Sequence, residues 1–278
     1  MKRILLTVAA LAVCCLQTGA WSRRNHQAIA YIAEQHLTPQ AAATVKELLH
    51  GQSLTYYAGW MDDFRTLELI TLPEPDKNGK TEVERVHYFK VDKKFRPLNT
   101  PYQDGLWLIA DAVENLYNYK RLTDEARLDY MKVLAHLVGD VHCPGHISYA
   151  DKRDKKLGKY KVLDHKNREI AKFHKFLDFT ALDWRFPGGM TDLAYIADPL
   201  LRQCPTEAEK EYMKKVQEGS IMEWGKEIAV SCKDLFTKVP PEHQMTIEEI
   251  QWIADLEKDQ ILRAGYRLAK ILNDVFSE

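Results

Sequence analysis

A hydrophobic repeat of three and four residues runs along most of this chain and restricts its fold more than any other feature. Over residues 105–119, for example, Leu106, Ile109, Val113 and Leu116 fall on one face of a helix. The same pattern predicts helices over residues 26–36, 41–49, 105–119, 125–141, 167–181, 207–235 and 246–276. Only residues 82–91, after a hairpin-like Asn78-Gly79 turn, read as extended. The polar loops at 73–80 and 151–161 are too short to separate domains, so we expect one all-α domain.

The first 20 residues have the composition of a secretory signal. A Lys-Arg pair precedes an apolar run from Ile4 to Leu16, and small residues end at Ala20. The run is about 13 residues long, shorter than the roughly 20 that a membrane-spanning helix needs. A lipoprotein signal ending at Cys14 or Cys15 is a less favoured alternative. We expect cleavage after Ala20, a domain over residues 21–278 without a membrane span, and a secreted or periplasmic protein.

The charge of the processed chain argues against a protein that binds nucleic acid through a large net positive charge. Without Lys2 and Arg3, 37 Lys and Arg stand against 40 Asp and Glu, a formal charge of −3. Any recognition of phosphate must therefore be local. Three cysteines remain after cleavage, and an exported location permits a disulfide, for which Cys204 and Cys232 are the favoured pair.

Two pairs of metal-binding residue types have helical spacing. His136 and Asp140 lie four residues apart, as do His174 and Asp178, and such residues share one face of a helix. Imidazole and carboxylate both suit zinc, although one pair alone is more typical of a helix-surface ion pair or a capped turn. His146 follows a Pro-Gly sequence that must end the first helix and turn the chain back towards Asp140.

Further candidates lie upstream. Asp62 and Arg65 lie three residues apart, and His87 is embedded among apolar neighbours. Cleavage after Ala20 makes Trp21 the first residue, five positions before His26. A free α-amino group, with a pKa of about 7.7–8.0, can lose its proton to a metal and chelate it together with its own carbonyl oxygen.

These motifs together resemble the trinuclear-zinc nucleases, the family of fungal single-strand nucleases and plant bifunctional nucleases with their bacterial relatives. The resemblance runs from Trp21 to the C-terminus and includes Ala264-Gly265-Tyr266-Arg267-Leu268-Ala269 near its end. It implies the mainly helical fold shared by zinc-dependent phospholipase C and these nucleases. The implied metal ligands are Trp21, His26, Asp62, His87, His136, Asp140, His146, His174 and Asp178.

The resemblance divides these ligands among three zinc ions. Site A takes Asp62, His87, His136 and Asp140; site B takes the amine and carbonyl of Trp21, His26 and the other oxygen of Asp140; site C takes His146, His174 and Asp178. Asp140 thus bridges sites A and B. Asp62, Arg65 and Asp140 are the implied catalytic residues, with Arg65 stabilising negative charge in the transition state.

The implied activity is hydrolysis of single-stranded DNA or RNA to 5′-phosphate products, together with 3′-nucleotidase activity. Tyr88, next to His87, is the candidate surface on which an unstacked base lies. The expected substrates are single-stranded nucleic acids or nucleotides, and the expected state is a monomer.

Three features depart from the family pattern. Lys90 stands where the nucleases usually have an acid that helps to bind the base. Cys143 and Gly145 stand where Gln and Leu are common, and Cys143 reads as a buried structural thiol in preference to an extra metal ligand. The loop between His146 and His174 carries several lysines. They are typical of a solvated surface loop, or alternatively they attract a polyanionic substrate to the exposed zinc.

Two other functions remain open. A zinc-dependent phospholipase C would share the fold, but its last ligand is typically Glu and its Trp-to-His gap is longer, so Asp178 and the short Trp21–His26 gap favour a nuclease. A non-catalytic zinc-binding protein would have closed four-ligand sites, whereas site C has three protein ligands.

Overall fold

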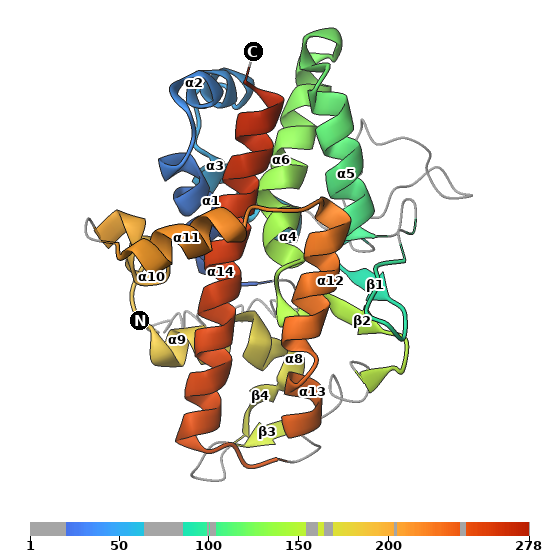
Figure 1. Cartoon of the computed structure of the whole chain (residues 1–278), viewed down its shortest axis with the longest axis vertical. Helices are drawn as coiled ribbons and strands as arrows, with labels where there is room; N and C mark the ends of the chain where they lie inside the picture. Colours follow the sequence, from blue (N-terminus) through green and yellow to red (C-terminus); the bar gives the residue numbers. More distant parts are fainter. Residues whose placement is uncertain are drawn as a thin grey trace, which may run out of the picture.

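The computed structural model describes residues 21–63, 86–98, 100, 104–153, 161–163, 169–202, 205–239 and 243–277. This part of the chain is mainly helical (Figure 1), which confirms the expected fold class. The α-helices are α1 (Arg23–Gln35), α2 (Pro39–Leu48), α3 (Leu54–Tyr57), α4 (Trp60–Asp63), α5 (Gly105–Leu116), α6 (Asp124–Asp140), α8 (Phe173–Lys175), α9 (Ala181–Arg185), α10 (Met190–Ala197), α11 (Glu207–Lys215), α12 (Ile221–Cys232), α13 (Leu235–Lys238) and α14 (Ile247–Val275). Single 3-10 turns are η2 (Tyr119–Arg121), η3 (Pro144–His146) and η5 (Leu200–Arg202), and η4 (Phe176–Thr180) is a π-helical turn.

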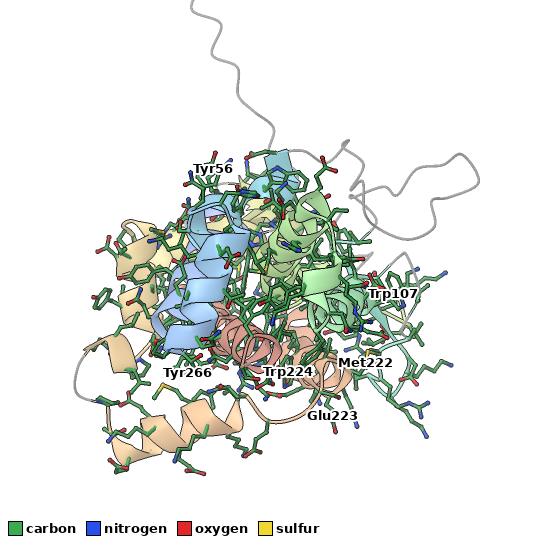
Figure 2. All side chains as sticks on the ribbon, turned by 90° about the horizontal axis from the view of Figure 1, so that it is seen from above. Tyr56, Trp107, Met222, Glu223, Trp224 and Tyr266 are labelled. Carbon is green, nitrogen blue, oxygen red and sulfur yellow. The ribbon has the colours of Figure 1, made fainter. Side chains whose placement is uncertain are left out.

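The long C-terminal helix α14 organises the core. It packs against α1, α6, α9 and α10, and it runs through the length of the molecule in Figure 1. Figure 2 looks along the bundle, with Tyr266 of α14 and Trp224 of α12 on the side where α11 packs. Because α1 and α14 are in contact, the beginning and end of the described chain share one hydrophobic core.

The residues at which several helices begin are determined by capping side chains. Ser22, Thr38 and Thr123 each accept a hydrogen bond from a backbone N–H in the first turn of α1, α2 and α6. Thr246 and Glu249 form a reciprocal capping box at the start of α14. Each cap contributes about 0.5–2 kcal/mol to stability. The Ser22 cap explains why α1 begins three residues before the expected His26.

Two of the expected helices are wrong in part. Residues 207–235 are not one helix, because Gly219 has φ 88°, a left-handed conformation that separates α11 from α12. Residues 169–172 of the expected helix 167–181 form strand β4 (Glu169–Lys172), which pairs antiparallel with β3 (Lys161–Leu163). Pairing with a neighbouring strand overrides a weak helical pattern there.

A second small sheet joins segments that are far apart in the sequence. Strand β1 (Phe89–Val91) pairs in parallel with β2 (Ile147–Tyr149), with Phe89 opposite Ile147. Only residues 89–91 of the expected extended segment form a strand, and residues 82–85 and the Asn78-Gly79 turn lie outside the described residues. Nothing in the sequence pattern predicted β2.

Two other expectations, the disulfide and the signal peptide, involve residues outside the described part of the chain. Cys232, expected to pair with Cys204, is a free and fully buried thiol of α12. Cys204 itself and the predicted signal, residues 1–20, lie outside the described residues. Within the described residues, no helix combines the length and the apolar character that crossing a membrane requires.

Candidate metal centre

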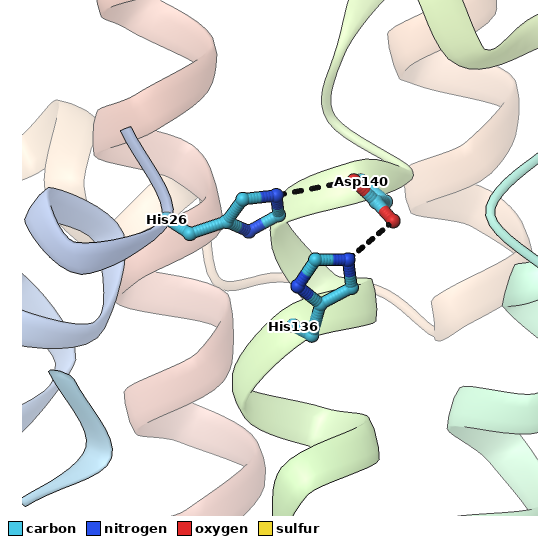
Figure 3. Close-up of side chains that lie close together, drawn as sticks. All are labelled: His26, His136 and Asp140. Carbon is cyan, nitrogen blue, oxygen red and sulfur yellow. Dashed lines mark ion pairs between the residues drawn. The ribbon is translucent and has the colours of Figure 1, made fainter. Parts of the chain in front are cut away.

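Helix α6 places an imidazole and a carboxylate side by side in the core. His136 and Asp140 are one helical turn apart and fully buried, with His136 Nε2 3.0 Å from Asp140 Oδ2. Helix α1 lies alongside and directs His26 to the same carboxylate, with Nε2 3.3 Å from Oδ1 (Figure 3). The rings of His26 and His136 stack with centroids 4.0 Å apart. Three of the predicted ligands therefore meet where two helices touch.

The β1–β2 pair adds two more imidazoles. His87 lies two residues before Phe89, and His146 lies one residue before Ile147, so the strand pairing brings both histidines to one end of the sheet. His87 Nδ1 is 2.5 Å from Asp140 Oδ2, and His146 Nδ1 is 3.5 Å from Asp140 Oδ1. Asp140 thus faces four imidazoles, two on each oxygen.

Asp62 of α4 joins this group from its more exposed side. Its Oδ2 is 3.9 Å from His26 Nε2, and its side chain is 21% exposed. One ligand atom from each of Asp62, His87 and His136 lies within 4.8 Å of the others. Arg65, predicted to stabilise the transition state, lies outside the described residues.

A third group lies at the π-helical turn that follows α8. His174 Nε2 is 3.4 Å from Asp178 Oδ2, and His146 Nε2 is 3.9 Å from Asp178 Oδ1. The expected four-residue spacing therefore brings the pair together, although the backbone is not a regular α-helix here. The side chain of His174 is 30% exposed, so this group opens towards solvent.

Trp21 lies beside this third group. Its side chain is fully buried, and the next residue, Ser22, donates its backbone N–H to the carbonyl oxygen of Asp178 at 3.1 Å. The same carbonyl accepts Nδ2 of Asn25 at 3.0 Å. These two hydrogen bonds hold the start of the described chain against the segment that carries Asp178.

The charges of the cluster favour neutral His26 and His146 and an ionised Asp140, whereas the pKa of His136 is raised. Burial, reinforced by His136, lowers the pKa of His26, and burial lowers that of His146 to about 3. Burial opposes ionisation of Asp140, but His136, His87 and His146 outweigh it and hold its pKa well below the usual value. For His136, burial is outweighed by Asp140, which raises its pKa to about 9. Neutral imidazole and ionised carboxylate are the forms that bind metal.

Several buried polar atoms of this cluster lack hydrogen-bond partners among the described residues. Both ring nitrogens of His26 and of His146, Nε2 of His87 and Oδ1 of Asp140 have none in the described chain. Leaving such an atom unsatisfied costs about 1–3 kcal/mol, so this number of them in one place requires a ligand. Nearby His142 is the contrast, because its Nδ1 bonds the Val138 carbonyl and its Nε2 accepts from Arg267. The donor set of imidazoles and carboxylates fits a divalent transition metal.

The family profile described as S1/P1 nuclease matches residues 21–277. The chain belongs to the S1/P1 nuclease family. It is 22% identical over 157 residues to nuclease S1 of Aspergillus oryzae, a match that covers 52% of this chain and 50% of that protein. It is 23% identical over 138 residues to nuclease P1 of Penicillium citrinum, covering 45% and 47%. The chain spans about half the length of the curated relatives that it matches.

Membership of the S1/P1 nuclease family confirms the resemblance seen in the sequence, while the ligand roles remain predictions. The structure brings the eight predicted ligands from His26 to Asp178 into one connected cluster. Of the two predicted substrate residues, Tyr88 is 36% exposed, and its ring centroid lies 4.7 Å from that of His146. Lys90 is exposed on β1.

Two contacts of this cluster were not predicted from the sequence. The Ala58 carbonyl accepts Nδ1–H of His136 at 2.6 Å, which fixes the ring and turns Nε2 towards Asp140. No sequence signal marks a backbone carbonyl. The second is Cys143, whose Sγ lies 3.8 Å from Asp178 Oδ1.

In the lysine-rich loop, Arg153 pairs with Asp151, and residues 154–160 lie outside the described chain.

Gly139→Ala is expected to displace His26 and reduce the metal content of the protein. A Cβ at Gly139 would lie 2.7 Å from His26 Nδ1, because α1 and α6 are in contact there. Overpacking of this kind costs about 1–3 kcal/mol. Elemental analysis and thermal unfolding measure both effects. Gly189→Ala is the control, since its Cβ would lie 3.6 Å from its nearest neighbour, and full metal content in Gly139→Ala would contradict the prediction.

Proposed function

We propose that this protein is a zinc-dependent endonuclease that hydrolyses single-stranded DNA or RNA to 5′-phosphate products and also acts as a 3′-nucleotidase. One observation carries the proposal: each oxygen of the buried Asp140 faces a different pair of imidazoles. His87 and His136 lie at Oδ2, and His26 and His146 lie at Oδ1. The site A ligands His87 and His136 lie at one oxygen and the site B ligand His26 lies at the other, which supports a carboxylate that bridges two metal ions. His146, also near Oδ1, is assigned to site C.

The remaining ligands fit three zinc ions per chain. Asp62 completes site A with His87 and His136, and the processed N-terminus at Trp21 completes site B with His26. His146, His174 and Asp178 hold site C, the most exposed of the three. Bound zinc would act as a Lewis acid: it would lower the pKa of a coordinated water and stabilise negative charge on the phosphate.

The protein residues have distinct roles in this proposal. Asp62, which is partly exposed, orients or deprotonates the attacking water. Arg65 stabilises the negative charge that develops on the phosphate. The bond from His136 to the Ala58 carbonyl keeps Nε2 directed at the cluster. The cluster, not the net charge of −3, attracts the phosphate.

The proposal is tested by assaying protein that begins at Trp21 on single-stranded DNA, double-stranded DNA and phosphatidylcholine vesicles. We expect single-stranded DNA to be cleaved fastest, hydrolysis to stop after chelation, and added zinc to restore it. Cleavage of phosphatidylcholine alone would indicate a phospholipase C. Bound zinc without hydrolysis of any substrate would indicate a non-catalytic protein.

Tyr88→Ala is expected to raise KM for single-stranded DNA by about 5- to 150-fold with a smaller effect on kcat. Stacking of one base on an aromatic ring contributes about 1–3 kcal/mol, and Tyr88 presents its partly exposed ring beside His146 and His174. Steady-state kinetics on oligonucleotides measure the change. Tyr88→Phe keeps the ring and should stay close to the wild type. An unchanged KM in Tyr88→Ala would remove Tyr88 from the substrate site.

A further inference from the structure

Cys143 is buried beside the ligands of site C. It lies between α6 and η3, its side chain is fully buried, and its Sγ is 3.8 Å from Asp178 Oδ1. One ligand atom from each of Cys143, His146 and Asp178 lies within 4.8 Å of the others. The sulfur therefore faces a carboxylate and an imidazole that are themselves predicted metal ligands.

The separations match those between ligands of one tetrahedral zinc ion. With Zn–S of about 2.3 Å and Zn–O of about 2.0–2.2 Å, a sulfur and an oxygen on the same ion are about 3.5 Å apart. The observed Sγ–Oδ1 distance of 3.8 Å is close to that value, and His146 Nε2 lies 3.9 Å from the same oxygen. The sulfur of Cys143, an oxygen of Asp178 and a ring nitrogen of His146 are thus almost as close to one another as the ligands of a single zinc ion are.

A second observation indicates that a cation is required there. Both ring nitrogens of His146 are buried without a hydrogen-bond partner among the described residues. Neutral thiol packing leaves these groups unsatisfied, because an S–H is a weak donor that can serve only one of them.

The other described cysteine shows what a purely structural thiol looks like in this fold. Cys232 of α12 is equally buried and free, and it makes no hydrogen bond to a described residue. Cys143 differs from it by facing a cluster of metal-binding groups. The interpretation of Cys143 as only a packed thiol therefore does not account for its surroundings.

We propose that Cys143 is a fourth protein ligand of site C, alongside His146, His174 and Asp178. The inference rests on the proposed function, because site C belongs to the proposed three-zinc centre. The S–H bond breaks as the sulfur–metal bond forms, and the proton passes to solvent, so no oxidant or reductant is involved. With Cys143, site C has four protein donors, as sites A and B have in the proposed assignment.

The test uses cobalt in place of zinc, because a thiolate bound to cobalt gives a sulfur-to-metal charge-transfer band in the near ultraviolet. The double variant Cys204→Ser, Cys232→Ser keeps Cys143 as the only cysteine from Trp21 onwards. We expect the band in the wild type and in this double variant, and its loss in Cys143→Ser. Cys232→Ser alone is the matched control and should keep the band.

X-ray absorption at the zinc edge provides a measurement that needs no variant. We expect a sulfur neighbour at about 2.3 Å in the wild type, so a failure of Cys143→Ser to fold does not prevent the test. Three bound metals with neither the band nor a sulfur neighbour would overturn the role of Cys143 and leave the proposed function intact. Protein that binds no metal would overturn both.

Discussion

Asp140→Asn is expected to slow hydrolysis of single-stranded DNA by more than about 100-fold and to release metal from sites A and B. Loss of a group that only supports a metal ligand costs about 10–100-fold, and Asp140 is predicted to ligate two ions directly. An amide offers one acceptor oxygen and a donor NH₂ group in place of two acceptor oxygens. It therefore cannot face the His87–His136 pair and the His26–His146 pair in the same way.

The measurement combines steady-state kinetics, elemental analysis and circular dichroism. Helix content should stay close to the wild type, because α6 is capped and packed independently of the charge on Asp140. Asp129→Asn is the control on the same helix, since Asp129 pairs with Lys132 at 3.2 Å and not with the histidines. An Asp140→Asn protein that cleaves RNA at the normal rate would disprove the bridging role.

A single residue retained before Trp21 is expected to remove the metal of site B and most of the activity. The extra residue converts the chelating amine into an amide, which does not ionise near neutral pH. Trp21 is fully buried and Ser22 is hydrogen-bonded to the Asp178 carbonyl, so the start of the described chain is held beside the cluster in which the amine would act.

The matched control is the same polypeptide before and after removal of a cleavable extension. Zinc per chain and the rate on single-stranded DNA are measured in both forms, and both should rise when Trp21 becomes the first residue. An extended form with three zinc ions and full activity would show that the amine is not a ligand.

The helical part of the site could be predicted from the sequence because its geometry is local. A four-residue spacing on a helix determines that His136 and Asp140 point the same way, and the structure has them 3.0 Å apart. The family resemblance then identified distant partners such as His26 that spacing alone cannot relate to α6. The capping residues of α6 and α14 were equally local, so the boundaries of these helices agree with the pattern to within two residues.

The remaining features depend on contacts between segments that are far apart in the chain. The parallel pairing of β1 with β2 involves three residues on each strand, too few for a sequence pattern to indicate. The hydrogen bond of His136 to Ala58 joins a side chain to a backbone carbonyl 78 residues away. The break at Gly219 was missed because apolar spacing continues across it, and a glycine in a helical pattern marks only a possible end.

The position of His87 and Tyr88 as neighbours has a consequence for where the substrate is cut. Consecutive residues are about 3.8 Å apart along the backbone, so a metal ligand and the proposed resting surface for a base are joined covalently. Thermal movement of the surrounding helices cannot change that separation. The distance between the base stacked on Tyr88 and the phosphodiester bond that is cleaved should therefore be the same for every oligonucleotide.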